Sequence, residues 1–403
     1  MEYTISGGHV IVLAIIVWFV GTYINRKVDF LERYSIPVAV TGGLLCSLIV
    51  ALIYYGSGIK IIFDTGLRDV LLLVFFSTIG LSAKLRLLRE GGKALFVLLL
   101  FAVALLVLQN ATGVALATLF GAHPGYGLFG GSVSLAGGHG TAIAWGAVAE
   151  KAGLVGAADI GIAFATLGLI AGGLIGGPIA ERLIDREGLR GTASRAERTT
   201  EAPSESAPRI QPSVPATLTT LMLLAICVEL GELVNEFLSA RGLTIPGFLT
   251  AMVVGIVIAN GADLFGFEID RASRERAGEL SLQLFLAMSL MSMQLWVLAG
   301  ALDKIVIVVF AQMAVITLLS VWLVFRAMGR DYDAAVIVAG FVGLGMGATP
   351  VGIANMNAIT EKYGPSPKAF LVVPLVGAFF LDVANALVIK TFLSLPLMQA
   401  GLP

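Results

Sequence analysis

The sequence predicts an all-α polytopic membrane protein, with ten transmembrane helices in two inverted five-helix repeats that each hold a Gly-rich re-entrant hairpin. Three observations support this fold class. The 403 residues are 57% hydrophobic and only 13% charged, whereas about a quarter of the residues in a soluble domain are charged. Ten long apolar runs follow one another along the chain. A polar linker separates two halves whose sequences resemble each other.

The apolar runs are long enough to cross ~30 Å of hydrocarbon as helices. The first begins near His9, with no basic residue before it and no small-residue cleavage site after it. We therefore interpret it as a span and not as a removable signal peptide. The expected spans cover residues 8–25, 36–56, 66–83, 93–120, 158–182, 215–239, 244–261, 279–299, 303–328 and 368–392.

Two further apolar stretches, residues 125–146 and 334–358, are interrupted by glycine clusters, and the second also contains Pro350. Unwound backbone exposes N–H and C=O groups that hydrocarbon cannot satisfy, so it is stable only where protein or a cavity surrounds it. We expect each stretch to be a re-entrant hairpin that enters and leaves the membrane on one side.

A polar segment rich in Pro and Ser divides the chain and lacks apolar periodicity, which predicts a flexible linker. The expected domains are an N-terminal repeat, residues 1–185, a cytoplasmic linker, residues 186–214, and a C-terminal repeat, residues 215–403. Since each half holds five spans, an odd number, the halves must be inverted in the membrane. Residues match in order at offsets of 209 to 211: Ile36-Pro37 and Thr41 with Ile245-Pro246 and Thr250, Phe75 and Ser82 with Phe285 and Ser292, and Glu150 with Glu361.

The basic residues predict the orientation in the membrane. With the N-terminus outside, 20 of the 26 Lys and Arg residues lie on the inner side. Both termini should therefore be extracytoplasmic and the linker cytoplasmic. The outer side keeps only Lys60, Arg68, Lys151, Arg241, Lys304 and Lys390.

Other classes of function lack their sequence features. The net charge is -1 and the basic residues are scattered, which argues against a nucleic-acid partner. Cys46 and Cys227 lie in apolar runs without CxxC spacing, so neither a disulfide framework nor a zinc site is indicated. An intramembrane enzyme would need motifs such as HExxH or DDxxD, which are absent. A channel would need repeated polar rings along a continuous pore.

The glycine clusters of the two hairpins indicate an anion site. The first reads GGHGT, Gly137 to Thr141, and aligns with GLGMGATP, Gly343 to Pro350, in the second repeat. Glycine lets backbone approach a ligand closely, and a helix that starts just after it points free N–H groups at the tip. For His139, a substrate contact and a structural role are both open. Glycines also permit close helix packing, and this is our interpretation for Gly168, Gly172, Gly173, Gly176 and Gly177.

Asp382 lies deep in the last span, thirteen uncharged residues after Lys368 and seven before Lys390. An ionisable group at this depth is costly and is a functional hypothesis by default. Asn385 follows at i+3 on the same helical face, and oxygen ligands suit a small hard cation. We predict sodium coordination, with a buried structural hydrogen bond as the alternative. Asn110 and its neighbour Gln109 occupy a comparable depth in the fourth span.

Five segments carry a specific family resemblance. They read SLAGGHGTA, GLGMGATPVGIANMNAITEKYGPS, AFLVVPLVGAFFLDVANALVIK, FDTGLRD and LLVFFSTIGLSAKL. Together they resemble the bacterial sodium/glutamate symporter family, and the similarity covers essentially the whole chain except the linker. The glycines of the two hairpin motifs match the glycines that the family carries there.

The resemblance implies an importer of L-glutamate in the bacterial inner (plasma) membrane, driven by sodium through alternating access and assembled as a homodimer. Sodium would be the coupling ion, no cofactor is expected, and proton coupling is the near alternative. Related citrate carriers have arginines near the second hairpin, and their absence here favours an amino-acid substrate. The candidate substrate residues are Gly137, Gly138, His139, Gly140, Thr141, Gly345, Gly347, Thr349 and Asn355. The candidate sodium ligands are Asp382, Asn385, Asn110 and Ser134.

Overall fold

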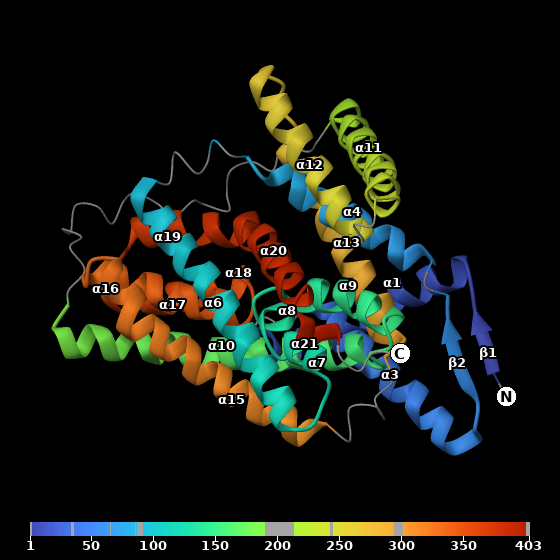
Figure 1. The fold of residues 1–403 in the computed structure, drawn as a ribbon, viewed down its shortest axis with the longest axis horizontal. Coiled ribbons are helices and arrows are strands. Elements are labelled where there is room, and N and C mark those ends of the chain that lie inside the picture. Colours follow the sequence, from blue (N-terminus) through green and yellow to red (C-terminus); the bar gives the residue numbers. More distant parts are fainter. Residues whose placement is uncertain are drawn as a thin grey trace. The chain divides into compact units, whose positions relative to one another are not determined.

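The computed structural model describes residues 2–33, 36–64, 66–84, 86, 92–189, 213–241, 245–293 and 301–399, and most of them lie in helices (Figure 1). Residues 190–212 of the expected linker therefore lie outside the described residues. Before the linker the helices are α1 Gly8–Asn25, α2 Asp29–Arg33, α3 Val38–Ser57, α4 Gly66–Ser82, α6 Gly92–Leu119, α7 Pro124–Phe129, α8 Ser132–Leu135, α9 Gly138–Lys151 and α10 Ala157–Glu187. After it they are α11 Val214–Ser239, α12 Gly247–Leu264, α13 Arg271–Met291, α15 Leu302–Leu319, η2 Ser320–Val324, α16 Phe325–Ala327, α17 Tyr332–Met346, α18 Thr349–Tyr363, α19 Pro367–Leu375, η3 Val376–Phe380, α20 Leu381–Leu393 and α21 Pro396–Gln399.

Seven helices in the described part of the chain are long and apolar enough to cross a membrane, as is typical of a multi-pass membrane protein. They are α1, α3, α6, α10, α11, α12 and the continuous helix Leu302–Ala327. The other three expected spans are shorter, partly charged or interrupted. Helix α4 has 17 residues, α13 opens on the charged RASRERAGE, and the last span divides into α19, the π-helix η3 and α20.

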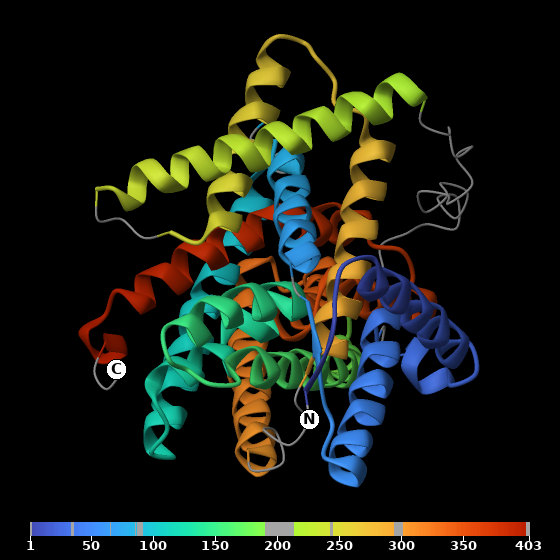
Figure 2. The ribbon, with the colours of Figure 1, turned by 90° about the vertical axis from the view of Figure 1, so that its right-hand side faces the viewer.

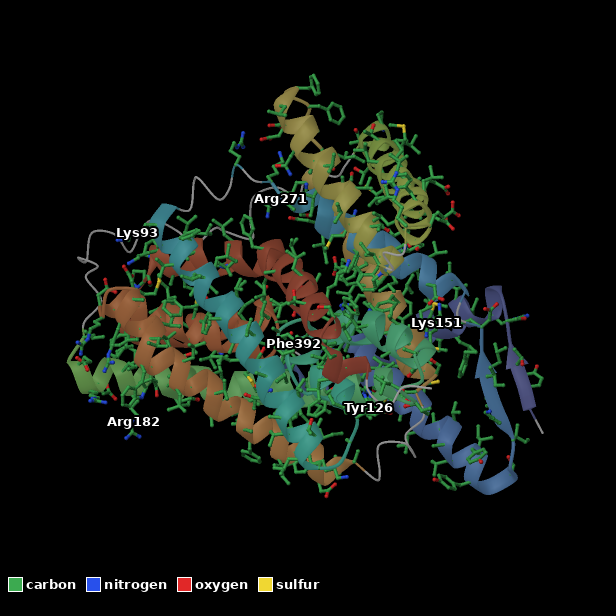
Figure 3. The ribbon with its side chains drawn as sticks, in the orientation of Figure 1. Lys93, Tyr126, Lys151, Arg182, Arg271 and Phe392 are labelled. Atoms are coloured by element: carbon green, nitrogen blue, oxygen red, sulfur yellow. The ribbon has the colours of Figure 1, made fainter. Side chains whose placement is uncertain are left out.

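Helix α13 begins well before the expected start at residue 279. Its first turns are too polar to be recognised from hydropathy, but Asp270 caps them by accepting a hydrogen bond from the Ser273 N–H at 2.7 Å. A side-chain hydrogen bond with Ser273, together with this backbone bond, lowers the pKa of the Asp270 carboxyl. Residues 294–299 of this expected span lie outside the described residues. Lys93 and Arg271 lie at the starts of α6 and α13, and Arg182 lies in the C-terminal part of α10 (Figure 3).

One small parallel sheet departs from the all-α expectation, which the other described elements follow. Strand β1, Glu2–Ile5, pairs with β2, Lys60–Phe63, with Glu2 opposite Lys60 and Ile5 opposite Phe63. Both strands contain isoleucine, and β1 adds Tyr and Thr, all of which favour extended backbone. Four residues are too few for hydrophobic periodicity to reveal a strand.

The chain forms two compact units, and each unit draws on both sequence halves. Unit 1 comprises Met1–Lys84, His139–Ala163 and Pro212–Asp303. Unit 2 comprises Leu85–Gly138, Phe164–Gln211 and Lys304–Pro403. Unit 1 thus holds the first three expected spans of each half. Unit 2 holds the last two expected spans of each half and the second hairpin. The first hairpin is divided, because α9 is assigned to unit 1.

Two helix pairs in unit 1 pack through glycine in corresponding ways. The first pair is α1 and α3, and the second is α11 and α12. Helix α11 also contacts α4, and Figure 2 shows it crossing both α12 and α4. At the first crossing, a Cβ on Gly21 would lie 2.0 Å from the Val38 carbonyl oxygen. At the second, a Cβ on Gly231 would lie 2.6 Å from the Ala251 Cα. Only glycine permits backbones this close.

The connections inside these two pairs are also alike. The Asn25 side chain donates to the Ile36 carbonyl at 2.8 Å, and the Asn235 side chain donates to the Ile245 carbonyl at 2.9 Å. A proline follows each isoleucine and precedes the next helix with nearly the same backbone angles. The shared Ile-Pro motif therefore corresponds to a shared local structure.

In unit 2, α10 packs through glycine against the second hairpin. A Cβ on Gly168 would lie 2.5 Å from the Met346 carbonyl oxygen, and one on Gly172 would lie 3.1 Å from the Met346 Cβ. A Cβ on Gly176 would lie 2.1 Å from the Asn355 side-chain nitrogen. The packing interpretation is confirmed for these three glycines. At Gly177 a Cβ would meet nothing within 4 Å among the described residues, so this glycine packs against none of them.

Candidate functional site

The first hairpin is a broken helix whose segments begin at defined positions. Pro124 occupies the first turn of α7, and the His123 ring accepts a hydrogen bond from the Gly125 N–H at 3.1 Å. The helix then breaks at Gly130 and Gly131 before α8 begins. A Cβ on Gly131 would lie 2.6 Å from the Asn110 Oδ1. A side chain at this break would therefore collide with α6.

Side chains from three different helices satisfy the unwound backbone of this hairpin. The Ser132 N–H donates to the Asn110 Oδ1 at 2.8 Å, and the Asn385 Nδ2 donates to the Ser132 carbonyl at 3.0 Å. The Gln312 Nε2 donates to the Gly130 carbonyl at 2.8 Å. These amides take the place of the water that exposed peptide groups would otherwise need. Polar side chains from otherwise apolar helices therefore stabilise the non-helical backbone at this break.

Around the same break lie buried polar atoms without a hydrogen-bond partner among the described residues. Three are oxygens of the first hairpin and α20: the Ser132 Oγ, the Ser134 Oγ and the Asn385 Oδ1. The Gln312 Oε1 and the Asn110 Nδ2 also have no partner, and all five residues are at most 1% exposed. Buried polar atoms in proteins nearly always have a partner in protein, water or ligand. Three oxygens suit a hard cation, whereas the unpaired Asn110 atom is a donor because its oxygen already accepts from Ser132.

Asp382 is the second residue of α20 and is half-buried. Helix α20 directly follows the π-helical segment η3, and such segments occur frequently at functional sites. Asn385 lies one helical turn further on and reaches α8 through its bond to Ser132. A Cβ on Gly377, within η3, would lie 2.5 Å from the Thr349 Oγ1. Thr349 is the first residue of α18, so η3 packs against the start of the second hairpin's second arm.

The second hairpin is tied together at its base, which positions its tip. Asp331 caps α17 by accepting from the Ala334 N–H at 2.7 Å. The Tyr332 hydroxyl donates to the Gly364 carbonyl, and the Ser366 hydroxyl donates to the Asp333 carboxylate at 2.6 Å. At the tip, α17 ends at Met346, and α18 begins without a side-chain cap. Its first N–H groups are therefore not used by a capping side chain.

The two glycine tips meet within unit 2. Gly138 has a φ of +69°, in the left-handed region that favours glycine. A Cβ built on it would lie 3.7 Å from the Gly347 carbonyl oxygen. Gly137 and Gly138 are half-buried. The alignment of the two glycine clusters thus corresponds to their proximity in space.

The remaining candidate substrate residues are placed differently. The Gly345 carbonyl accepts from the Gln109 Nε2 at 2.7 Å, and its Cβ position lies 2.4 Å from Leu105. The Asn355 amide donates to the Gly172 carbonyl at 3.0 Å and to the Ala339 carbonyl at 3.3 Å. Both residues therefore have internal packing roles. Three residues of the first hairpin are buried and belong to unit 1: His139, Gly140 and Thr141.

Two residues of this cluster were missed by sequence reasoning. Ser132 supplies both its backbone and an unpaired hydroxyl, and Gln312 donates to the carbonyls of Gly130 and Gln109, each at 2.8 Å. Gln312 had a usable signal, because it is an amide within the apolar run FAQMAVITLL. The depth argument that selected Asn110 applies equally to it. Ser132 had no such signal, since serine is common in membrane helices.

Seven long apolar helices and a buried polar cluster beside a broken hairpin define a multi-pass membrane protein, and broken helices of this kind are typical of secondary transporters. A model of the sodium/glutamate symporter family matches residues 3–365. The chain is 41% identical over 390 residues to the sodium/glutamate symporter of Escherichia coli K12, covering 96% of this chain and 97% of that protein. It is 38% identical over 394 residues to the sodium/glutamate symporter of Haemophilus influenzae, covering 97% and 98%. The chain belongs to the sodium/glutamate symporter family.

Proposed function

We propose that this protein imports L-glutamate with sodium across the bacterial inner membrane by alternating access. The observation that carries the proposal is the group of unpaired oxygens of Ser132, Ser134 and Asn385 beside the broken first hairpin. A dehydrated cation would satisfy these oxygens. Both relatives are named sodium/glutamate symporter, which supports the same ion and substrate.

In this proposal the cation and the anion occupy neighbouring places in unit 2. Sodium takes the oxygens near Asp382 and Asn385, with Ser134, and Asn110 orients the hairpin backbone. Glutamate takes the glycine tips at Gly138 and Gly347, where helix starts present N–H donors to a carboxylate. The opposite charges of the two ligands offset each other away from water. The further candidate substrate contacts are Gly137, His139, Gly140, Thr141, Gly345, Thr349 and Asn355.

The proposed architecture has ten spans in two inverted repeats and forms a homodimer. The matching Asn25 and Asn235 hydrogen bonds support a repeat, because their donors recur at an offset of 210 and their acceptors at 209. The partition into two units supports a division between a scaffold and a mobile bundle, because each unit takes corresponding pieces of both halves. Alternating access in transporters commonly moves one bundle against another.

Purified protein in liposomes is expected to accumulate labelled glutamate when a sodium gradient is imposed, since cation entry drives symport. Uptake is measured against liposomes with a potassium gradient and against empty liposomes. Uptake that does not exceed the potassium control would refute sodium-coupled transport.

A cysteine at Ser204 is expected to resist impermeant thiol reagents in intact cells, since 20 of the 26 basic residues predict a cytoplasmic linker. The variant is made with Cys46 and Cys227 replaced by alanine, and labelling is compared before and after permeabilisation. Equal labelling in intact and permeabilised cells would reverse the proposed orientation.

A further inference from the structure

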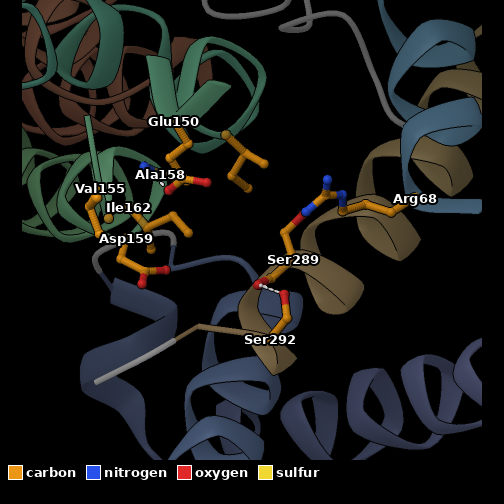
Figure 4. A pocket seen from close by; sticks show the side chains of 10 residues that line it. Arg68, Glu150, Val155, Ala158, Asp159, Ile162, Ser289 and Ser292 are labelled. Carbon is orange, nitrogen blue, oxygen red and sulfur yellow. Dashed lines mark hydrogen bonds between the residues drawn. The ribbon is translucent and has the colours of Figure 1, made fainter. Parts of the chain in front are cut away.

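A cavity of about 290 Å³ lies within unit 1, separate from the hairpin tips. Its polar lining comes from three places along the chain: Arg68 at the start of α4, Glu150 and Asp159 on either side of the turn between α9 and α10, and Ser289 and Ser292 near the end of α13 (Figure 4). Convergent polar groups in a concave space are the usual form of a small-molecule site.

The cavity has two chemically different walls. Glu150 and Asp159 lie on one side, and Arg68 lies opposite with the two serines (Figure 4). The Glu150 Oε1 accepts from the Ala158 N–H at 3.2 Å, which fixes the acidic wall to the start of α10. A positive group suits this first wall, and a carboxylate suits the second.

The basic wall retains donors for a ligand. The Arg68 Nε and Nη2 donate to the Asp69 Oδ1 at 2.9 and 2.7 Å. A guanidinium has five N–H groups in a fixed fork, so these bonds leave three. Ser289 is 5% exposed, and its hydroxyl has no hydrogen-bond partner among the described residues. An unpartnered buried hydroxyl in the cavity wall is a second, independent indication of a ligand.

We propose that this cavity binds the head group of an α-amino acid, with the α-carboxylate at Arg68 and Ser289 and the α-ammonium at Glu150 and Asp159. The inference rests on the proposed function for its ligand, which is L-glutamate on its way to the hairpin tips. Val155 lines the cavity and is exposed, so the side-chain carboxylate of glutamate stays hydrated there. In the proposed orientation, Arg68 lies on the outer side of the membrane.

Helix α9 connects this cavity to the tip. Ile143 and Glu150 line the cavity, and His139 lies one turn before Ile143 on the same helical face. From Glu150 to Gly138 the helix rises ~18 Å. Residues 139–146 are buried, so the cavity and the tip are two distinct places along one helix.

The charges of the cavity also predict what it rejects. Its lining holds two carboxylates and one guanidinium, and that guanidinium already pairs with Asp69. A dicarboxylate without an ammonium group would leave Glu150 facing an anion, which costs binding free energy. The cavity should therefore distinguish L-glutamate from 2-oxoglutarate, its keto-acid analogue.

A cysteine at Val155 tests this site directly. Val155 lines the cavity and is 75% exposed, so an impermeant thiol reagent reaches it once Cys46 and Cys227 are replaced by alanine. L-glutamate is expected to slow labelling several-fold, and 2-oxoglutarate is expected to leave it unchanged. Leu119→Cys is the matched control, because Leu119 is 76% exposed at the end of α6 and does not line the cavity. Equal protection by both compounds, or by neither, would overturn the proposal.

Three variants separate the cavity from the hairpin site. L-glutamate should still protect Val155→Cys from labelling when Gly138→Val is also present, because that substitution acts at the hairpin tip. Loss of protection in this double variant would show that protection arises from glutamate bound at the tip. Arg68→Gln should abolish protection by glutamate. Glu150→Gln, which keeps an acceptor for the Ala158 N–H, should let 2-oxoglutarate protect; unchanged discrimination in this variant would refute the acidic wall. Protection in a parent protein that shows no sodium-driven uptake would support the cavity while refuting the proposed function.

Discussion

Gly138→Val is expected to abolish glutamate binding and transport. The φ of +69° at Gly138 is one that a β-branched residue resists. Valine would therefore shift the backbone at the start of α9, where N–H groups are proposed to meet the carboxylate. The Cβ itself would fit, 3.7 Å from the Gly347 carbonyl oxygen, but the two γ-methyl groups would occupy the gap between the tips. We expect affinity to fall at least about 100-fold, or ~2.7 kcal/mol.

Gly121→Val is the matched control for this prediction. Gly121 has a φ of +70°, and a Cβ there would meet nothing within 4 Å. It therefore carries the same backbone strain, worth roughly 1–2 kcal/mol, without filling any space near the site. Glutamate binding is measured for both purified variants at saturating sodium, with thermal melting as the folding check. If Gly138→Val binds as tightly as Gly121→Val, the tip only serves packing.

Asp382→Asn is expected to weaken the sodium dependence of uptake while the protein remains folded. The substitution keeps the volume and removes the charge, so a cation loses its strongest electrostatic partner. We expect the sodium concentration for half-maximal uptake to rise at least about tenfold, equivalent to ~1.4 kcal/mol. Uptake is measured over a sodium series at fixed glutamate concentration and is normalised to the amount of reconstituted protein.

Asp303→Asn provides the comparison for Asp382→Asn. Asp303 is an exposed residue in the first turn of α15, so the same chemical change occurs in contact with water. Its sodium activation curve should match that of the parent. An unchanged sodium activation curve for Asp382→Asn, combined with a lower melting temperature, would show that Asp382 makes a structural hydrogen bond and does not bind sodium.

Hydropathy located the helix segments well but not their polar extensions. The expected first span, residues 8–25, coincides with α1, because that helix is mostly apolar and contains no Asp, Glu, Lys or Arg. In α13 the polar start from Arg271 was invisible to hydropathy, and its cap at Asp270 depends on one side-chain hydrogen bond. The β1–β2 pairing joins segments almost sixty residues apart, and no local pattern encodes such a partner.

The sequence indicated several polar residues around the broken hairpin, but it did not indicate which groups they hydrogen-bond. Depth in an apolar span drew attention to Asn110 and Asn385, and both side chains hydrogen-bond to the same residue, Ser132. Their role as sodium ligands stays a prediction. The sequence alone does not say whether a buried amide serves the backbone or a ligand, and Asn355 illustrates the first case. The cavity at Arg68 was missed because its walls come from distant segments that have no common motif.

The broken first hairpin also has a consequence for how the protein is made. Its peptide groups at Gly130 and Ser132 are satisfied by Gln312 and Asn385, which lie 182 and 253 residues later in the chain. While the N-terminal half emerges from the ribosome, these donors do not yet exist, and lipid cannot replace them. The nascent hairpin must therefore stay hydrated or sheltered during insertion until the last helix has been synthesised. The first half of the chain can therefore reach its final structure only after the second half has been synthesised.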